Sequence, residues 1–591
     1  MSHSTTAPPV WVQHPGHSPS AAAELARAHE LPLAMAHVLV NRGVRDRDDM
    51  LRFLDPVPEY LHDPTRMKGL EAAAERIERA LRDGETIFIQ GDYDVDGITS
   101  TFLLYRVLTR ELGGRAEYFI PDRLTDGYGL TVRAVEDAHA RGCSLIVTVD
   151  CGITAHEPVA HARGLGIDVV VTDHHEPTSV LPAAVAVVNP LQPGCPYPYK
   201  HLAGVGVTFK LVERLLRERD EASGDALGRA GAYLDVVALG TIADVVPLTG
   251  ENRVLARLGL DRLNAHPRLG LDALRRQSPQ RRFNGGATPP LNSTHVAFQL
   301  APRINAAGRM GRAADGVRLL LAETEAEAGA IARELELLNQ SRRDEDSSLR
   351  DEAVQRVERQ ISSDPGRRSI VLWDESWHPG VIGIVASRLV EKYHLPTVLV
   401  SLKHGSGRGS CRSIAGVDLT RVLQGCDDLL LAHGGHAFAA GLSIAPDRLE
   451  EFRERFDRLV TEAADEDRFA TRIRYEAELA PQDCTLELVQ ALERLAPFGL
   501  DNPEPVFRMD GVRLLQPREV GQGRHLRFDV HAPGGRGRET IEAIGFGFAE
   551  RFALAGLRSA TRADLLVVPS RNEWMGQTRL QLKLRDLRIV G

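Results

Sequence analysis

The chain has 591 residues, too many for one hydrophobic core, so two to four domains are expected. Its composition, 43% hydrophobic and 26% charged, is that of a globular protein, and no apolar run approaches the ~20 residues that span a bilayer. The net charge of −9 gives no overall indication of a nucleic-acid partner, and the six scattered cysteines are typical of reduced thiols in a cytosolic protein.

The first 20 residues, MSHSTTAPPVWVQHPGHSPS, have neither the basic start nor the apolar centre of a signal peptide. They are expected to form a disordered leader. Residues 1–50 are thus predicted to be a leader and a helical segment.

Residues 51–320 are predicted to form one domain, and from about residue 70 to 260 the sequence alternates strand and helix patterns. The strand candidates are ETIFIQ (85–90), AEYFI (116–120), SLIVTVD (144–150) and DVVVTD (168–173), and helical stretches such as 102–112 and 131–141 separate them. This alternation predicts a parallel sheet with helices on both faces.

Three more segments follow. Residues 321–363 are rich in Ala, Glu, Arg and Leu and predict a long helical connector. Residues 364–466 predict a second α/β domain, with strands at 369–374 and 397–402 and helices at 380–393, 418–430 and 447–464. Residues 467–591 show short alternating strands with Gly-rich turns, typical of a small β-barrel.

The segment QGDYDVDGITS, residues 90–100, has the D-x-D-x-D-G opening of a calcium-binding EF-hand loop. Such a loop needs a bidentate Glu at its twelfth position, which here is Leu103. An EF-hand loop also lies between two helices, whereas this segment follows an apolar strand. We therefore expect Asp92, Asp94 and Asp96 to lie where a strand passes into a helix, which is where α/β sheets bind ligands.

Further acidic and histidine side chains share this context. Asp150 ends the strand LIVTVD, the triplet Asp173, His174 and His175 ends DVVVTDHH, and Asp244 stands in the apolar stretch VVALGTIADVVPL. Each has an ordinary explanation, because an Asp after a strand is often a helix N-cap and a His pair is usually surface or structural. Since the carboxyl ends of parallel strands meet at one edge, we expect these side chains to converge.

A set of five or more converging carboxylates needs cations to neutralise it. Carboxylate and imidazole ligands together suit Mn²⁺ or Mg²⁺. The number of ligands indicates two ions, and a pair of ions ~3.5–4 Å apart is the usual device for hydrolysing phosphate esters.

The motifs DYDVDG, VTVDCG, VTDHHEP and ALGTIADVVPL resemble those of the DHH phosphoesterases. Within that group the chain resembles the RecJ family of single-strand exonucleases. The segments that carry this resemblance run in order over residues 50–591 and include IPDRLTDGYGL, LAGVGVTFKL, APRINAAGRMG, GSCRSIAGVDL, HGGHAFAAGLSI, LAPFGLDNPEPVF and NEWMGQTRLQLKLRD. The resemblance implies a DHH-type parallel-sheet domain, a long connecting helix, a DHH-associated α/β domain and a C-terminal OB-type barrel.

The resemblance also implies the metal ligands and catalytic residues. The implied metal ligands are Asp94, Asp96, Asp150, His174, His175 and Asp244, with Asp150 as the bridge and the choice between the two histidines left open. The implied catalytic residues are Asp92, Asp150, His175 and His436. Smaller relatives place a His where this chain has Gln90, so the ligand set of the first ion is open, and Asp173 is expected to orient a neighbouring His.

Phosphate and base contacts are implied in three places. The segment GSGRGSCRS is expected to be a Gly-rich loop before a helix that offers Arg408, Ser410 and Arg412 to phosphate oxygens. His436 is expected to reach the scissile phosphate. The implied DNA contacts of the first domain are Arg123, Tyr128, Arg303, Asn305 and Arg309. Ordinary turns and solvated surface are the alternative for the loop and the arginines.

The barrel is expected to bind single strands through basic and aromatic side chains. Residues 511–591 hold 14 Lys/Arg against 8 Asp/Glu. Of the aromatic residues Phe507, Phe528, Phe546 and Trp574, most are expected in the core, with Trp574 as the exposed exception.

The resemblance implies a single-stranded-DNA-specific 5′→3′ exonuclease of DNA repair and recombination that releases 5′-mononucleotides with two Mn²⁺ or Mg²⁺ ions. Two alternatives stay open, a phosphodiesterase of short oligonucleotides or cyclic dinucleotides and a non-catalytic single-strand-binding replication factor. The barrel argues against the first and the intact motif carboxylates against the second. The expected partners are single-stranded DNA, a single-strand-binding protein and a helicase, and the chain is expected to be a cytoplasmic monomer without membrane attachment.

Overall fold

The computed structural model describes residues 8–123, 126–220, 227–278, 290–403, 405–531, 540–549, 557, 560–574 and 577–590. Contacts divide the chain into two compact units, and each is described by itself. Unit 1 consists of Met1–Val12, Arg309–Gly311 and Glu336–Ile473, and unit 2 of Gln13–Gly308, Arg312–Leu335 and Arg474–Gly591. The five predicted domain boundaries are finer than this division and stay a prediction.

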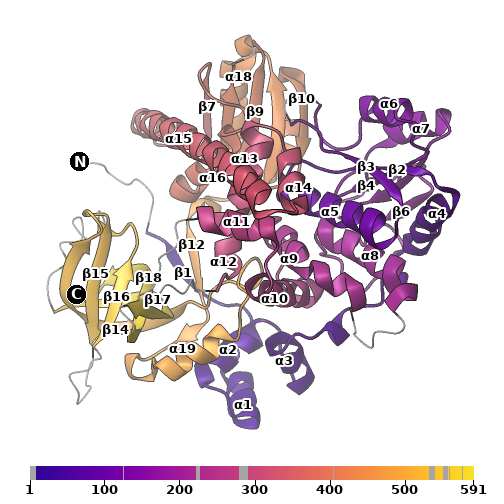
Figure 1. Ribbon diagram of the computed structural model, residues 1–591. Helices are drawn as coiled ribbons and strands as arrows, with labels where there is room; N and C mark the ends of the chain where they lie inside the picture. The colour runs from indigo at the N-terminus through magenta and orange to yellow at the C-terminus, as the bar shows by residue number, and fades with distance from the viewer. Residues whose placement is uncertain are drawn as a thin grey trace. The chain divides into compact units, whose positions relative to one another are not determined.

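The first sheet of unit 2 is wholly parallel, as the sequence predicts. Its strand order is β3-β2-β4-β5-β6. Its central strands β2, β4 and β5 are almost entirely buried, because helices cover both faces (Figure 1). The strands are β2 (Thr86–Gln90), β3 (Arg115–Phe119), β4 (Leu145–Val149), β5 (Asp168–Thr172) and β6 (Ala186–Val188).

Alternate side chains of the sheet define its two faces. Phe88, Ile146 and Val171 pack with helices α6 and α7 on one face. Helices α4, α5 and α8 contact the strands from the other side. The helices of this region are α4 (Leu70–Asp83), α5 (Val95–Arg106), α6 (Val132–Ala140), α7 (His156–Gly164), α8 (Gly204–Asp220), α9 (Leu234–Ala243), α10 (Gly250–Ala265), α11 (Leu269–Gln277), α12 (Ser293–His295), α13 (Ala301–Met310) and α14 (Ala314–Leu321).

The C-terminal strands close into a five-stranded barrel. They pair in the order β14-β15-β16-β18-β17, and β17 returns to β14, which removes the open edges. The short strand β13 adds to β14 in parallel. The elements are β13 (Ala477–Glu478), α19 (Leu486–Glu493), β14 (Phe507–Val520), β15 (His525–His531), β16 (Ile541–Gly545), β17 (Thr561–Trp574) and β18 (Gln577–Ile589). This confirms the predicted barrel.

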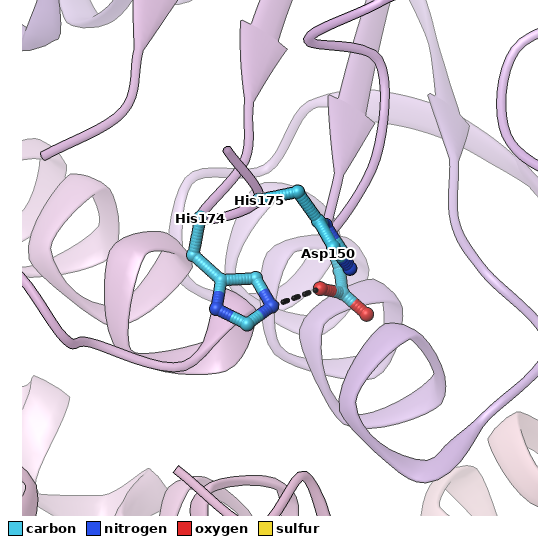
Figure 2. A group of neighbouring side chains, drawn as sticks. All are labelled: Asp150, His174 and His175. Atoms are coloured by element: carbon cyan, nitrogen blue, oxygen red, sulfur yellow. Dashed lines mark ion pairs between the residues drawn. The ribbon is translucent and has the colours of Figure 1, made fainter. Parts of the chain in front are cut away.

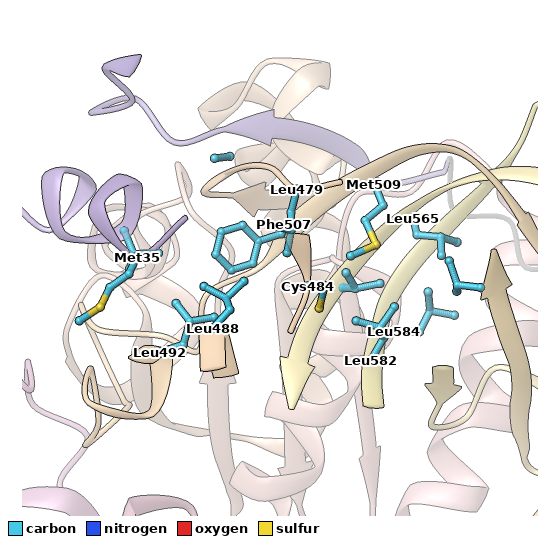
Figure 3. Packing of buried hydrophobic residues seen from close by; sticks show 14 of the residues in the cluster. Met35, Leu479, Cys484, Leu488, Leu492, Phe507, Met509, Leu565, Leu582 and Leu584 are labelled. Atoms are coloured by element: carbon cyan, nitrogen blue, oxygen red, sulfur yellow. The ribbon is translucent and has the colours of Figure 1, made fainter. Parts of the chain in front are cut away.

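The N-terminal helices share a hydrophobic core with the barrel. Met35 of α2 belongs to the same cluster as Leu488 of α19, Phe507 of β14 and Leu582 of β18 (Figure 3). The N-terminal helices are α1 (Pro19–His29), α2 (Leu33–Asn41) and α3 (Arg47–Leu54). The two ends of the chain therefore stabilise each other across more than 400 residues of sequence.

The prediction of a disordered leader is wrong for residues 8–20. The segment forms β1 (Val10–Gln13), which pairs with β12 (Arg472–Tyr475), and then enters α1. The N–H of Val10 donates to the carbonyl of Thr471 at 2.8 Å, and that of His14 to Tyr475 at 2.9 Å. The sequence pattern gave no sign of this because the partner strand is some 460 residues away.

Unit 1 holds a mixed sheet in the order β10-β11-β9-β8-β7, with only β7 and β8 parallel. Helices α17 and α18 pack on one face, and α16 with the second half of α15 on the other. Its elements are β7 (Ile370–Asp374), α16 (Ile382–Tyr393), β8 (Thr397–Ser401), β9 (Gly407–Arg412), α17 (Leu419–Gln424), β10 (Leu430–Gly435), β11 (Ala439–Ile444) and α18 (Leu449–Ala463). The predicted connector is a single helix, α15 (Glu325–Ser363).

Two expectations for unit 1 are wrong. The segment GSGRGSCRS is not a loop before a helix, because residues 407–412 form the central strand β9 between β8 and β11. The helix predicted at 418–430 ends at Gln424, and the chain then forms the hairpin β10–β11. Glycine-rich strands lack the apolar alternation on which the prediction relied.

The packing of α9 on α10 can be tested by a substitution at Gly259 of α10. A Cβ at this position would lie 2.1 Å from the carbonyl oxygen of Leu234, so the backbone of α9 would have to move. Gly259→Ala should therefore lower the free energy of unfolding, although Gly→Ala inside a helix ordinarily stabilises by roughly 0.5–1 kcal/mol. The control is Gly329→Ala in α15, where the nearest group is the end of the Arg333 side chain. Urea denaturation in which both variants gain stability would contradict this packing.

Candidate active site

Three aspartates lie between β2 and α5. The carboxylate of Asp94 caps α5 by accepting the N–H of Gly97 at 3.0 Å. Asp96, in the first turn of α5, is buried and accepts the N–H groups of Gly204 and Val205, each at 2.7 Å. Position 97 has to be glycine because a Cβ there would lie 2.6 Å from the backbone of Asp92. The glycine of the calcium-like motif thus serves a close approach of two chain segments.

Asp150 follows β4 and has a left-handed backbone with φ of 61°. Its side chain is buried against Gly204, where a Cβ would lie 2.3 Å from its Oδ1 atom. Gly204 therefore has two functions: its N–H holds Asp96, and its missing side chain leaves room for Asp150.

The three residues after β5, Asp173, His174 and His175, have different partners. The buried carboxylate of Asp173 accepts the backbone N–H groups of Ile153, His174 and His175 and the ring of His175 at 2.7 Å. These contacts occupy both of its oxygens, which agrees with an orienting function. The Nε2 atom of His174 instead lies 3.2 Å from Oδ1 of Asp150 (Figure 2).

Asp244 reaches the same place from a helix. It follows the last residue of α9, and its Oδ2 lies 3.5 Å from Nε2 of His174. That nitrogen is also 3.9 Å from Oδ2 of Asp96. The stretch 234–243, for which the sequence pattern indicated only apolar character, is helical. The predicted convergence of Asp96, Asp150, His174 and Asp244 is confirmed.

The electrostatics of the cluster reflect its burial. Burial raises the pKa of Asp92, Asp96, Asp150 and Asp244, and neighbouring carboxylates raise it further, for Asp96 to about 7. Burial also lowers the pKa of His174 to about 4, with the charge of His175 adding to the effect. His174 is thus a neutral imidazole at neutral pH, the form in which histidine binds metals.

His175 behaves in the opposite way. Burial by itself lowers its pKa, but the hydrogen bond to Asp173 and the charge of that carboxylate outweigh it and raise the pKa to about 9. Its ring also lies 3.3 Å from the hydroxyl of Tyr128.

The residues present fit a divalent metal site. Three overlapping groups have their ligand atoms within 4.8 Å of one another, and their members are Asp92, Asp94, Asp96, Asp150, His174, His175 and Asp244. Oδ1 of Asp92, Oδ1 of Asp150 and Nε2 of His174 are buried without a hydrogen-bond partner among the described residues. Unpaired buried acceptors are costly, so a cation with a preference for oxygen and imidazole ligands matches this set.

The side-chain amide of Gln90 donates to the carbonyls of Gly91 and Gly129, while its buried Oε1 has no partner in the described part of the chain. This position, where smaller relatives have a His, therefore presents an oxygen in the same neighbourhood.

The predicted DNA contacts of unit 2 divide into two groups. Arg123 is exposed and stacks over the ring of Tyr93 at 5.0 Å, Tyr128 is half exposed, and Asn305 accepts the N–H of Val95 at 3.2 Å. These side chains lie around the candidate metal ligands. The prediction for Arg303 is wrong, because this side chain is fully buried and donates to the carbonyls of Gln299 and Gln277.

The remaining predicted contacts belong to unit 1 or to the barrel. Arg412 donates to the hydroxyls of Ser387 and Ser410, and Arg309 to the carbonyl of Gly380. Arg408 and His436 are exposed. On the barrel, Phe507 and Phe528 are buried as expected, Phe546 is 60% exposed, and the side chain of Trp574 lies outside the described residues.

Comparison with known proteins identifies the family. Residues 86–241 match the DHH family, N-terminal domain, residues 366–462 the DHHA1 domain, and residues 475–586 the RecJ OB domain. The chain is 40% identical over 575 residues to the single-stranded-DNA-specific exonuclease RecJ of Escherichia coli K12, covering 94% of this chain and 96% of that protein. The chain belongs to the RecJ family.

Two other RecJ proteins support this membership. RecJ of Bacillus subtilis is 37% identical and is matched over 95% of this chain and 68% of its own length. The crystal structure of Thermus thermophilus RecJ in complex with Mn²⁺ superposes with a TM-score of 0.81 at 33% identity, covering 98% of this chain and 79% of that one. The RecJ resemblance and the predicted multidomain α/β fold with an OB-type barrel are therefore confirmed.

Gly204 and Val205 were not among the site residues predicted from the sequence. Both stand in LAGVGVTFKL, quoted above for its resemblance to RecJ, and their N–H groups are what fixes Asp96. The signal that could have identified them is a pair of glycines at the start of an apolar helix.

Among the described residues, no helix is both long and apolar enough to cross a membrane.

The raised pKa values give a prediction for the metal-free protein. Because the folded state holds these carboxyl protons more tightly than the unfolded state does, the contribution of these carboxyl groups to stability should fall as pH rises from about 4 to about 7, while the lowered pKa of His174 acts in the opposite direction. In chelator at pH 8, Asp150→Asn should raise Tm by about 2–4 °C because it removes one of the repelling charges. Thermal melts provide the measurement.

Asp173→Asn is the matched control, because hydrogen bonds and the charge of His175 hold the pKa of Asp173 low despite its burial. This substitution should lower Tm. Equal losses for both variants would contradict repulsion at Asp150.

Proposed function

We propose that the chain is a single-stranded-DNA-specific 5′→3′ exonuclease that hydrolyses phosphodiester bonds with two divalent ions and releases 5′-mononucleotides. The observation that supports it most is the meeting of Asp96, Asp150, Asp244 and a neutral His174 at one place, with unpartnered buried ligand atoms. The substrate assignment rests on the related exonucleases, and a barrel suited to single strands agrees with it.

The ions would be held by Asp94, Asp96, Asp150, His174 and Asp244, with Asp150 shared by both ions. Asp92 and His175 would lie next to these ligands. When bound, Mn²⁺ or Mg²⁺ supplies activation of water and neutralisation of charge on the phosphate. Relatives from Thermus thermophilus have been crystallised with each of these ions.

The protein's own groups prepare this chemistry. The N–H groups of Gly204 and Val205 hold Asp96 in one orientation. Asp173 holds His175, whose raised pKa keeps a proton on its ring beside Tyr128. A protonated ring at this position is suited to hydrogen-bond a phosphate oxygen, and burial strengthens such a contact.

In unit 2, Arg123 is proposed to contact the terminal phosphate, Asn305 the strand and Tyr128 a stacked base. In unit 1, Ser410 and Arg412 are proposed to contact the terminal phosphate, and Arg309, Arg408 and His436 the strand. The guanidinium of Arg412 is held by two serine hydroxyls and the carbonyl of Cys411, which fixes its orientation. Within DNA repair and recombination, a single-strand-binding protein and a helicase are the expected partners, and a cytoplasmic monomer is the expected form; these points rest on the family resemblance.

Long single strands labelled at the 5′ or the 3′ end test the proposal. With Mn²⁺ or Mg²⁺, the 5′ label should appear first as a mononucleotide, and chelator should stop the reaction. Preference for dinucleotides or cyclic dinucleotides would favour the phosphodiesterase alternative. Strand binding without turnover in either metal would favour the binding factor.

Asp150→Ala should reduce kcat to less than about a thousandth while single-strand binding persists, because a bridging carboxylate serves both ions. The comparison is Asp137→Ala, a partly exposed carboxylate on α6 that pairs with Arg141, which should retain full activity. Binding is measured in chelator by fluorescence anisotropy. A variant at position 150 that keeps a tenth of the rate at saturating Mn²⁺ would reject the bridging position.

Arg412 is expected to read the terminal phosphate. The ratio of kcat/KM for 5′-phosphorylated and 5′-hydroxyl strands should fall by about tenfold or more in Arg412→Ala, because a charge-assisted contact is worth ~1.5–3 kcal/mol. Arg421→Ala, an exposed arginine of α17, should leave the ratio unchanged. If Arg412→Ala slows both substrates equally, this residue contacts an internal phosphate instead.

A further inference from the structure

Residues 494–503, here called the junction turn, lead from α19 toward β14 and carry part of the motif LAPFGLDNPEPVF. The side chain of Arg253, at the start of α10, is buried against this turn. Its guanidinium donates to the carbonyls of Leu495 and Ala496, each at 2.9 Å, and to that of Phe53 at 2.7 Å. Among the described residues it meets carbonyl oxygens rather than a carboxylate, so it works as a clamp on backbone.

Asn502 closes the same turn from within. Its fully buried amide donates to the carbonyls of Leu495 and Pro497, both at 2.9 Å, and its Oδ1 accepts the Nε–H of Arg42 at 3.3 Å. Its backbone exchanges hydrogen bonds with Gly499 in both directions. The conformation of the turn is therefore fixed by two side chains.

The junction turn touches the loop that follows Asp244. The N–H of Leu248 donates to the carbonyl of Leu500 at 2.9 Å, and Leu248 packs directly on Gly499, where a Cβ would lie 2.6 Å from it. Between Asp244 and this anchor the chain turns through Val245, whose φ of 60° is unusual for a β-branched residue. A strained short loop keeps its shape only when both ends are held.

Asp244 depends on its backbone for orientation more than Asp94 and Asp96 do. Asp96 is held by two N–H groups and Asp94 by one. In the described part of the chain, the Asp244 carboxylate accepts no hydrogen bond; Nε2 of His174 lies 3.5 Å from it, and a carboxylate oxygen of Asp96 lies within 4.8 Å. Whatever fixes the loop 244–250 therefore fixes this carboxylate.

We propose that the junction turn, clamped by Arg253 and Asn502, is a positioning device for Asp244 that sets the affinity of the active site for its divalent ions. The inference rests on the proposed function insofar as Asp244 is a ligand there. It assigns positioning residues outside the DHH motifs, in the segment that leads into the barrel. Residues that orient a ligand in this way typically change metal affinity by about 10–100-fold.

Calorimetric titration of the full-length protein with MnCl₂, without DNA, provides the test. Asn502→Ala should raise the Kd for Mn²⁺ by about tenfold. Asn264→Ala is the matched control: its amide also donates to two carbonyls, and its Oδ1 also accepts an N–H, but at the far end of α10. It should leave the Kd within about twofold of wild type. Equal Kd values for the two variants would overturn the proposal.

A double variant shows through which residue the effect passes. In an Asp244→Ala background, Asn502→Ala should cause no further loss of Mn²⁺ affinity, whereas an additive loss would show that the turn does not act through Asp244. Raising Mn²⁺ should restore the kcat of Asn502→Ala, because the defect is in occupancy. If Asn502→Ala does not fold, Arg253→Lys is compared in its place, since an ammonium has too few donors to hold the same carbonyls.

Failure of the proposed nuclease function can be distinguished from failure of the positioning proposal. A wild-type chain that binds Mn²⁺ but does not cleave single strands would reject the nuclease and leave the positioning effect measurable. A wild-type chain that cleaves strands while its Mn²⁺ affinity is indifferent to Asn502 would reject only the positioning device.

Discussion

Mutual repulsion of buried carboxylates at one edge of a parallel sheet is the constraint on which the rest of this site depends. The ligand atoms of each candidate metal-binding group lie within 4.8 Å of one another, a distance at which two like charges near a protein surface repel by on the order of 4 kcal/mol. Metal ions offset this, but the chain must hold the ligands before the ions arrive. It does so with backbone N–H groups at Asp94, Asp96 and Asp173, and with close glycine contacts at Gly97 and Gly204.

The same constraint explains why the two histidines differ. His174 has a depressed pKa because burial and the neighbouring imidazolium of His175 outweigh the attraction of the Asp173 carboxylate. His175 has its own carboxylate, Asp173, and remains protonated. At neutral pH, His174 therefore offers a nitrogen lone pair and His175 offers a proton. The difference is set by Asp173, which binds no ion in the proposed site.

The part of this arrangement that follows strand ends was predictable from the sequence, because the rule for parallel sheets is local: Asp92 to Asp96, Asp150 and His174 each follow an apolar run. Asp244 was found by its motif, but its helix was not, since a uniformly apolar stretch has no period that separates helix from strand. The burial of Arg303, the strand β9 and the pairing of β1 with β12 depend on partners distant in sequence. No local pattern encodes them.

Contacts within unit 2 connect the barrel to the domain that contains the candidate active site. The N-terminal helices pack into the barrel core, while Arg42 and Arg253 bind the junction turn from two directions. A barrel attached in this way is not an independent appendage, because its supporting turn also carries the anchor of the loop after Asp244. If binding of a strand to the barrel changes the affinity of the site for metal through this turn, then binding of metal must change the affinity for the strand by the same factor. The loop after Asp244, a proposed ligand in the first half of the chain, is hydrogen-bonded to the turn that leads into the C-terminal barrel.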